Sequence, residues 1–147
     1  MKVRPNEYFM KLALQEAALA LAHDEVPVGA VVVLNNMVIA RGHNQVELLT
    51  DATAHAEMIA LTAAGNAIKS KYLDECSIFI SLEPCPMCAA ALNWARIGQV
   101  IFAAADSKNG YTRISRKLLH PKTEVSSGLM EVESAIMLRE FFKKKRV

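Results

Sequence analysis

A stretch near the middle of the chain indicates the fold most directly: Ser77-Ile78-Phe79-Ile80-Ser81-Leu82-Glu83-Pro84-Cys85-Pro86-Met87-Cys88. Its first half, Ser77 to Leu82, predicts a strand, since it is mostly apolar with β-branched and aromatic side chains. Pro86 suits the first turn of a helix, which we expect to run from Pro86 to Ala95. Gly98 to Ala103 predicts a further strand. Strands that alternate with helices predict an α/β sheet covered by helices, with the later strands parallel.

The segments on both sides of this stretch add further elements. Residues 6–22 carry apolar side chains at near-helical spacing and predict a helix. Val28 to Leu34 predicts a buried strand, followed by an Asn35-Asn36 turn and a paired strand from Met37 to Ala40. The remaining expected elements are a helix over 55–66, an irregular polar segment over 105–127 with a helical turn near Leu118, a strand from Leu129 to Val132 and a helix over 134–146.

The composition is that of one globular domain. The chain has 147 residues, of which 52% are hydrophobic and 22% are charged, and this excludes a disordered or low-complexity protein. We find no internal repeat or linker and expect a single domain over residues 1–147. The longest apolar run, Pro27 to Leu34, is less than half the roughly 20 residues that span a bilayer. Glu7 and Lys11 interrupt any signal-peptide pattern, so we expect a cytoplasmic protein with no membrane partner.

The charge is unevenly distributed along the chain. The formal net charge is only +2, but Lys and Arg gather in residues 107–123, which hold no acid, and in residues 139–147, which hold only Glu140. Basic segments on an otherwise acidic chain indicate a polyanionic partner. A solvated loop and a solvated helix end are the alternative explanation.

The cysteines favour metal binding over disulfides. The chain holds three, Cys76, Cys85 and Cys88, and an odd number without a signal peptide argues against a disulfide framework. Cys85 and Cys88 share one face of the predicted helix, in a first turn where the helix dipole favours thiolates. A redox motif of this spacing is expected after the first strand of a βαβ unit, whereas this pair follows a strand in the middle of the chain.

His55-Ala56-Glu57 opens another predicted helix and supplies an imidazole. Two thiolates and an imidazole are three zinc ligands, and a zinc site with three protein ligands keeps a position for water, as catalytic sites do. No fourth ligand is evident, because the other candidates are more typical of packed or surface residues; they are His23, His43, Cys76 and His120. The sequence therefore predicts a catalytic zinc site.

Glu57 is positioned to serve that site as a general base. Coordination lowers the pKa of a bound water towards about 7, so a neighbouring carboxylate can take its proton. Residues two apart on an ideal helix point to nearly opposite sides, so His55 and Glu57 converge only if His55 lies at the helix start, with Thr53 as the N-cap. The alternative for Glu57 is a surface acid that stabilises the helix dipole.

The motif H-x-E followed by P-C-x-x-C is the signature of zinc-dependent nucleobase deaminases. Over nearly its whole length the chain resembles the bacterial tRNA-specific adenosine deaminases. Further similar stretches are Glu25-Val26-Pro27-Val28-Gly29-Ala30-Val31-Val32, His43-Asn44, Arg96-Ile97-Gly98, Asp106 with Lys108 and Gly110, Leu119-His120-Pro121 and Phe141-Phe142.

This resemblance implies a fold, an activity and partners. The fold would be the cytidine-deaminase-like three-layer α/β/α sandwich with a five-stranded mixed sheet. His55, Cys85 and Cys88 would hold one Zn²⁺ per subunit, and Glu57 would be the catalytic acid and base. The enzyme would hydrolyse adenosine to inosine at the wobble position of a tRNA anticodon. It would bind the anticodon stem-loop as a homodimer.

The resemblance also implies roles in substrate binding. Asn44 would hydrogen-bond the flipped base, with an ordinary turn residue as the alternative. The backbone at Val28, Gly29 and Ala30 would approach the base closely, and Pro84 would also contact the substrate. Phe142 fits an apolar set with Leu138, which leaves Phe141 to stack on a nucleotide. The implied RNA contacts are Asp106, Lys108, Phe141, Lys143, Lys144 and Arg146.

The chain departs from the family's pattern where RNA is expected to bind. Ala52 stands where the family often has Pro, Ala105 where it often has Arg, and Tyr111 to Arg116 replaces a small glycine-rich stretch. Pro84 to Cys88 also resembles bacterial guanine deaminases. Two alternative functions therefore stay open: a free-base or nucleoside deaminase acting on guanine or cytosine, and a non-catalytic zinc-stabilised RNA-binding module.

Overall fold

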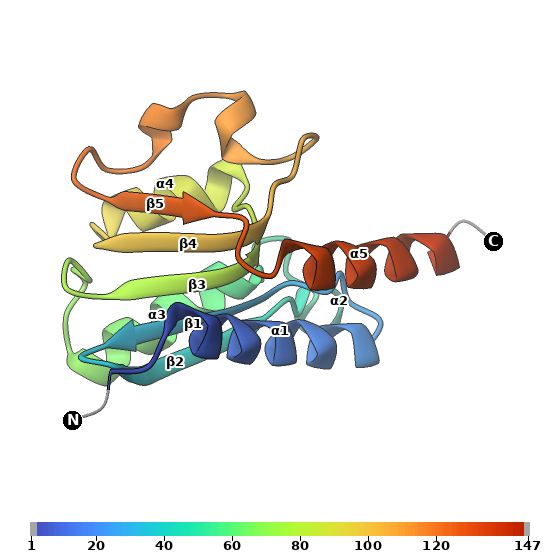
Figure 1. Cartoon of the computed structure of the whole chain (residues 1–147), viewed down its shortest axis with the longest axis horizontal. Helices are drawn as coiled ribbons and strands as arrows, with labels where there is room; N and C mark the ends of the chain where they lie inside the picture. The colour runs from blue at the N-terminus through green and yellow to red at the C-terminus, as the bar shows by residue number, and fades with distance from the viewer. Residues whose placement is uncertain (1–2, 146–147) are drawn as a thin grey trace.

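A five-stranded mixed sheet forms the centre of the computed structural model, which describes residues 3–145 (Figure 1). The strand order is β2-β1-β3-β4-β5. β1 pairs antiparallel with both β2 and β3, whereas β3 with β4 and β4 with β5 are parallel pairs, so the expectation of parallel later strands is confirmed. The strands are β1 Gly29–Leu34, β2 Met37–His43, β3 Ser77–Leu82, β4 Gln99–Ala104 and β5 Glu124–Ser127.

Helices cover both faces of this sheet and complete the expected three layers. α1 and α5 lie on one face, and α3 and α4 lie on the other (Figure 1). The helices are α1 Asn6–Ala22, α2 Val46–Leu49, α3 Ala56–Ile68, α4 Pro86–Trp94 and α5 Glu131–Lys145, with single 3₁₀ turns at Tyr111–Arg113 and Arg116–Leu118. Among residues 3–145, none of the helices combines the length and apolar character that crossing a bilayer requires.

Alternate residues of the central strands supply the two cores. Val31 and Phe79 pack with Phe9 and Met10 of α1, whereas their strand neighbours pack against α3 and α4. Strands buried on both faces read as continuous apolar runs, which is why β1, β3 and β4 were predicted closely from the sequence. α3 lies close to the sheet because it presents alanines there, and a Cβ added at Gly42 of β2 would lie 2.6 Å from the Ala56 carbonyl oxygen.

The structure corrects the expected C-terminal elements. The strand predicted from Leu129 to Val132 is wrong, because β5 is Glu124–Ser127 and α5 already begins at Glu131. β5 is a fully exposed edge strand, and among residues 3–145 it pairs with β4 alone, so it carries none of the apolar pattern by which a buried strand is recognised. Positive φ angles at Gly128 and Met130 turn the chain from β5 into α5.

Candidate active site

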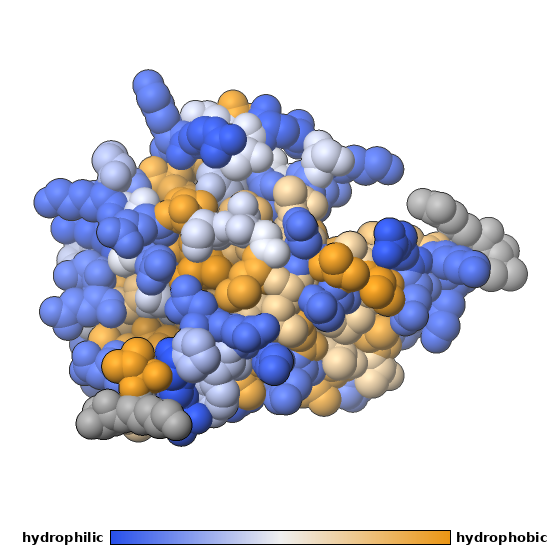
Figure 2. Space-filling model, viewed as in Figure 1, coloured by the Kyte–Doolittle hydropathy of each residue, from blue (hydrophilic) through white to orange (hydrophobic). Residues whose placement is uncertain are grey.

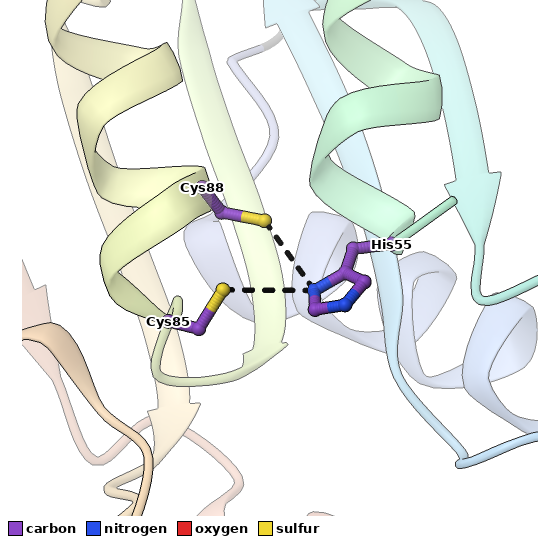
Figure 3. A group of neighbouring side chains, drawn as sticks. All are labelled: His55, Cys85 and Cys88. Carbon is purple, nitrogen blue, oxygen red and sulfur yellow. Dashed lines mark hydrogen bonds between the residues drawn. The ribbon is translucent and has the colours of Figure 1, made fainter. Parts of the chain in front are cut away.

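Three residues that can ligate a metal, His55, Cys85 and Cys88, are called the metal group below. They lie at the starts of two helices on the same side of the sheet. His55 is the N-cap of α3 with φ −75° and ψ 153°, and Cys85 is the N-cap of α4 with φ −72° and ψ 169°. These extended conformations turn both side chains away from the helix axes and toward each other (Figure 3). Pro86 occupies the first turn of α4 as expected, and Cys88 lies one turn along.

The ligand atoms have the spacing of a tetrahedral zinc site. His55 Nδ1 lies 3.6 Å from Cys85 Sγ and 3.6 Å from Cys88 Sγ, and all three atoms lie within 4.8 Å of one another. Tetrahedral bonds of about 2.3 Å to sulfur and about 2.0 Å to nitrogen place N and S about 3.5 Å apart, close to the observed distances. Among residues 3–145 no fourth His, Cys, Asp or Glu joins this group, since Cys76 is buried in the core. The residues therefore fit a zinc ion with one coordination position left for water.

The two thiols differ in charge in the absence of metal. A hydrogen bond from Cys88 and a second from His55 lower the pKa of Cys85 to about 4, so Cys85 is a thiolate at neutral pH. The same contact and burial raise the pKa of Cys88. The hydrogen bond to Cys85 also raises the pKa of His55. A bound metal cation would favour deprotonation of both thiols.

Glu57 lies buried beside this group rather than on the surface. Only 3% of the residue is exposed, and burial raises the pKa of its carboxyl to about 7. The Cys85 thiolate adds to this increase in the pKa of Glu57. The expectation that His55 lies at the helix start is confirmed, and this position lets His55 and Glu57 face the same site.

The predicted N-cap is wrong, and its correction explains the position of Asn44. Thr53 does not cap α3; its backbone N–H and hydroxyl both donate to Asp51 Oδ1, which lowers the pKa of Asp51. Instead, Asn44 Oδ1 accepts the hydrogen bond of the Ala56 N–H at 2.8 Å. The Asn44 Nδ2 group makes no hydrogen bond with any of residues 3–145, and Asn44 lines the cleft that leads to the metal group. Asn44 thus fixes the start of α3 and keeps a donor free.

A cleft of about 1380 Å³ opens onto the metal group. One wall comes from residues 23–28 and 44–47, and the other comes from residues 105–109 and Arg113. The rim is completed by α5, and the outline of the molecule in Figure 2 is indented between α5 and the segment after β4. Sites for small ligands usually measure about 300–1,000 Å³, so the cleft has room for more than one base.

Some of the predicted substrate and RNA residues line the cleft and others do not. Lining residues include Val28, Asn44, Asp106 and Lys108, whereas Gly29, Ala30 and Pro84 do not line the cleft. Three positions where the chain departs from the family's pattern also line it: Ala52, Ala105 and Arg113.

Helix packing explains why a glycine is required at position 29, without a close approach to the base. A Cβ added at Gly29 would lie 2.1 Å from the Ala13 carbonyl oxygen of α1, so the glycine allows the helix to pack on β1. Ala30 belongs to the core on the other face of the sheet. Pro84 is buried, and its carbonyl accepts the Tyr111 N–H at 2.9 Å.

The predicted orientations of Phe141 and Phe142 are reversed. Phe141 is 7% exposed and Phe142 is 44% exposed, and both rings line the cleft. Phe141 lies on the buried face of α5, seven residues after the buried Ser134. Leu138 precedes Phe141 by three residues and Phe142 by four, and both spacings place side chains on one helix face, so the sequence did not show which ring is buried. Lys143 and Lys144 are exposed, and Arg146 lies outside the described residues.

Two buried glutamates were missed. Glu25 is 3% exposed and Glu83 is 4% exposed, and each carboxylate accepts backbone hydrogen bonds from a segment of the cleft wall. Their burial has no signal in hydrophobic periodicity, because the donors lie more than twenty residues along the chain, in α2 for Glu25 and in the segment after β4 for Glu83.

Comparisons with known proteins agree with this site. Residues 3–104 match the model of the cytidine and deoxycytidylate deaminase zinc-binding region. A relative from Agrobacterium fabrum, named tRNA-specific adenosine deaminase, is 44% identical over 95% of this chain and 95% of its own. A solved structure from a study of A-to-I editing by tRNA:A34 deaminases at the wobble position is 42% identical, with a TM-score of 0.83, over 89% of this chain and 99% of its own.

A solved guanine deaminase from Bacillus subtilis is also similar: it is 36% identical with a TM-score of 0.69, over 76% of this chain and 74% of its own. The family model covers both metal motifs, and its description names the metal that the ligand spacing fits. The chain therefore belongs to the cytidine and deoxycytidylate deaminase family.

Proposed function

We propose that this protein deaminates adenosine to inosine at the wobble position of a tRNA anticodon. The observation that carries the proposal is the cleft, which ends at the metal group, exceeds the size of one base and has exposed cations on its wall. Relatives named tRNA-specific adenosine deaminase cover nearly the whole chain and support the same substrate. We propose that residues 1–147 act as one domain, and the cytoplasmic location stays a prediction.

The chemistry divides between the metal and the residues around it. When bound by His55, Cys85 and Cys88, Zn²⁺ lowers the pKa of a coordinated water to about 7. Glu57 then accepts a proton from the attacking water and delivers it to N1 of adenine while C6 is attacked. The same carboxylate next takes the proton of the new C6 hydroxyl and delivers it to the amine, which leaves as ammonia when the C6–N bond breaks and C6 becomes a carbonyl. A pKa of about 7 suits a group that both accepts and releases a proton near neutral pH.

The cleft residues hold and orient the substrate. The free Nδ2 donor of Asn44 would bind an acceptor on the flipped base, while its Oδ1 keeps α3 in place. Phe142, rather than Phe141, offers an exposed ring on which a neighbouring base can stack. Lys108 and Lys143 are exposed and suit phosphate contacts.

We also propose that two copies of the chain form the active enzyme. Several large apolar side chains are exposed to solvent, and Trp94 at the end of α4 is 83% exposed. Exposed apolar side chains are typical of surfaces that are buried in a protein–protein contact. Size-exclusion chromatography with light scattering should give twice the 16.1 kDa of one chain. A mass of one chain at micromolar concentration would contradict the dimer.

A comparison with Glu57→Gln tests whether the site is catalytic. The zinc-loaded protein should form inosine in an anticodon stem-loop that carries adenosine at the wobble position. Glu57→Gln keeps the size of the side chain, so it should retain zinc but lose at least about 100-fold in rate. Equal rates of inosine formation by the two proteins would contradict the role of Glu57, and RNA binding without inosine formation by either protein would support a non-catalytic RNA-binding module.

A further inference from the structure

The buried carboxylate of Glu83 connects the metal-binding loop to one wall of the cleft. Glu83 precedes Cys85 by two residues, and its Oε1 accepts the Asp106 N–H at 3.1 Å. Its Oε2 accepts the Thr112 N–H at 3.0 Å and the Thr112 hydroxyl at 2.8 Å. One side chain therefore holds both ends of the segment 106–112.

The segment has little freedom to leave Glu83. A Cβ added at Gly110 would lie 2.1 Å from Glu83 Oε2, so only glycine allows this approach. The Gly110 N–H donates to the Asp106 carbonyl at 2.9 Å, and the Tyr111 N–H donates to the Pro84 carbonyl at 2.9 Å. A buried carboxylate is costly unless it is hydrogen-bonded, and three donors satisfy this one. The segment thus has one defined position relative to the metal-binding loop.

This segment carries the cations of the cleft wall. Lys108 lies within it, Arg113 follows it directly, and both are exposed side chains that line the cleft. Within residues 3–145 neither of them forms an ion pair. The Lys108 N–H is itself fixed by Asp106 Oδ1 at 3.1 Å. Unpaired cations beside a cleft attract a polyanion, so the position of this backbone determines where phosphates bind.

We propose that Glu83 is a positioning residue for RNA. It holds Lys108 and Arg113 on the cleft wall so that they bind phosphates next to the target nucleotide while its base lies at the metal group. This inference rests on the proposed function, because it assigns these cations to an RNA strand. Glu83 itself does not touch the substrate; it acts through the two cations.

A double-mutant cycle separates this role from simple support of the fold. The four zinc-loaded, full-length proteins are the unsubstituted chain, Glu83→Gln, a wall variant that combines Lys108→Ala and Arg113→Ala, and all three substitutions together. Each is titrated with a fluorescently labelled anticodon stem-loop at several salt concentrations, and kcat for inosine formation is measured at saturating RNA. Zinc content is measured alongside.

The wall variant should raise Kd about tenfold and reduce the slope of log Kd against log salt by about 1.4, the value for two phosphate contacts on a single strand. Glu83→Gln should raise Kd about fivefold, with kcat and zinc content within twofold. Adding Glu83→Gln to the wall variant should raise Kd less than twofold further, because the groups it positions are already gone.

Glu25→Gln is the matched control. Glu25 is an equally buried carboxylate, and it accepts the Glu47 N–H at 3.1 Å and the Leu48 N–H at 2.9 Å on the opposite wall. Any effect of Glu25→Gln on Kd should multiply with that of the wall variant, because Glu25 does not hold the basic segment.

Three results would overturn the inference. The increases in Kd caused by Glu83→Gln and by the wall variant could multiply when the substitutions are combined. Glu83→Gln could lower kcat or zinc content without changing Kd. Glu83→Gln could also leave Kd, kcat and zinc content all unchanged. If Glu83→Gln does not fold, Thr112→Val removes only the hydroxyl bond and should show the same coupling with a twofold rise in Kd. An unsubstituted protein that neither binds nor deaminates the stem-loop would overturn the proposed function, and the inference with it.

Discussion

Asn44 shows how one residue can combine a structural and a chemical role. Asn44→Asp keeps the acceptor for the Ala56 N–H, and a negative charge suits the start of α3, so stability and zinc content should stay close to those of the unsubstituted protein. The substitution removes the Nδ2 donor, so inosine formation should fall at least about 100-fold. Asn44→Ala should lose this activity and also about 1 kcal/mol of unfolding free energy, measured by urea denaturation. Full activity of Asn44→Asp would show that the donor does not bind the base.

The thiols should report the metal site directly. Because the pKa of Cys85 is lowered to about 4 in the absence of metal, its alkylation by iodoacetamide should change little between pH 6 and pH 8. An ordinary thiol, whose pKa lies above that range, would react about tenfold faster for each pH unit. Burial and the neighbouring Asp74 raise the pKa of Cys76, so Cys76 should stay unmodified.

Zinc should protect Cys85, and removal of zinc with a chelator should expose it. Mass spectrometry of the alkylated peptides distinguishes Cys85 from Cys76. Alkylation that rises tenfold per pH unit, or that zinc does not slow, would contradict the assigned ligand group.

At the scale of the element, the close packing of α3 on β2 positions half of the metal site. Gly42→Ala would bring a Cβ within 2.6 Å of the Ala56 carbonyl oxygen, which is backbone and cannot move aside alone. We expect a loss of about 3 kcal/mol in unfolding free energy and weaker zinc retention, because His55 moves with α3. Gly128→Ala is the control: its added Cβ meets nothing within 4 Å, so only the strain of its φ of +99° remains, at about 1 kcal/mol. Equal losses for the two variants would contradict this packing account.

The buried elements were predictable, whereas the elements fixed by distant hydrogen bonds were not. β3 and α1 have the bounds that their apolar patterns predicted, and the ligand group follows from the spacing of His55, Cys85 and Cys88. β5 was missed because an exposed edge strand carries no apolar pattern. The N-cap was misplaced because α3 takes its cap from Asn44, twelve residues earlier in the chain. Local patterns cannot report such contacts, since the fold itself brings the partners together.

For the whole molecule, the uneven charge predicts a steep dependence on salt. The segments 107–123 and 139–147 concentrate basic residues, although the net charge is only +2. If about three phosphates are contacted, kcat/KM for the stem-loop should fall about 20-fold between 50 mM and 200 mM salt. Turnover at subsaturating RNA across this range is the measurement. A rate that is independent of salt would mean that these segments are solvated surface.

The substrate is the central claim, and a side-by-side assay tests it most directly. The zinc-loaded protein is incubated with the wobble-adenosine stem-loop, free adenosine, guanine and cytosine, and the products are separated by liquid chromatography and identified by mass. We predict inosine in the stem-loop and no comparable turnover of the three small molecules. Rapid conversion of guanine or another free base, with the stem-loop unchanged, would keep the metal chemistry and contradict the tRNA substrate.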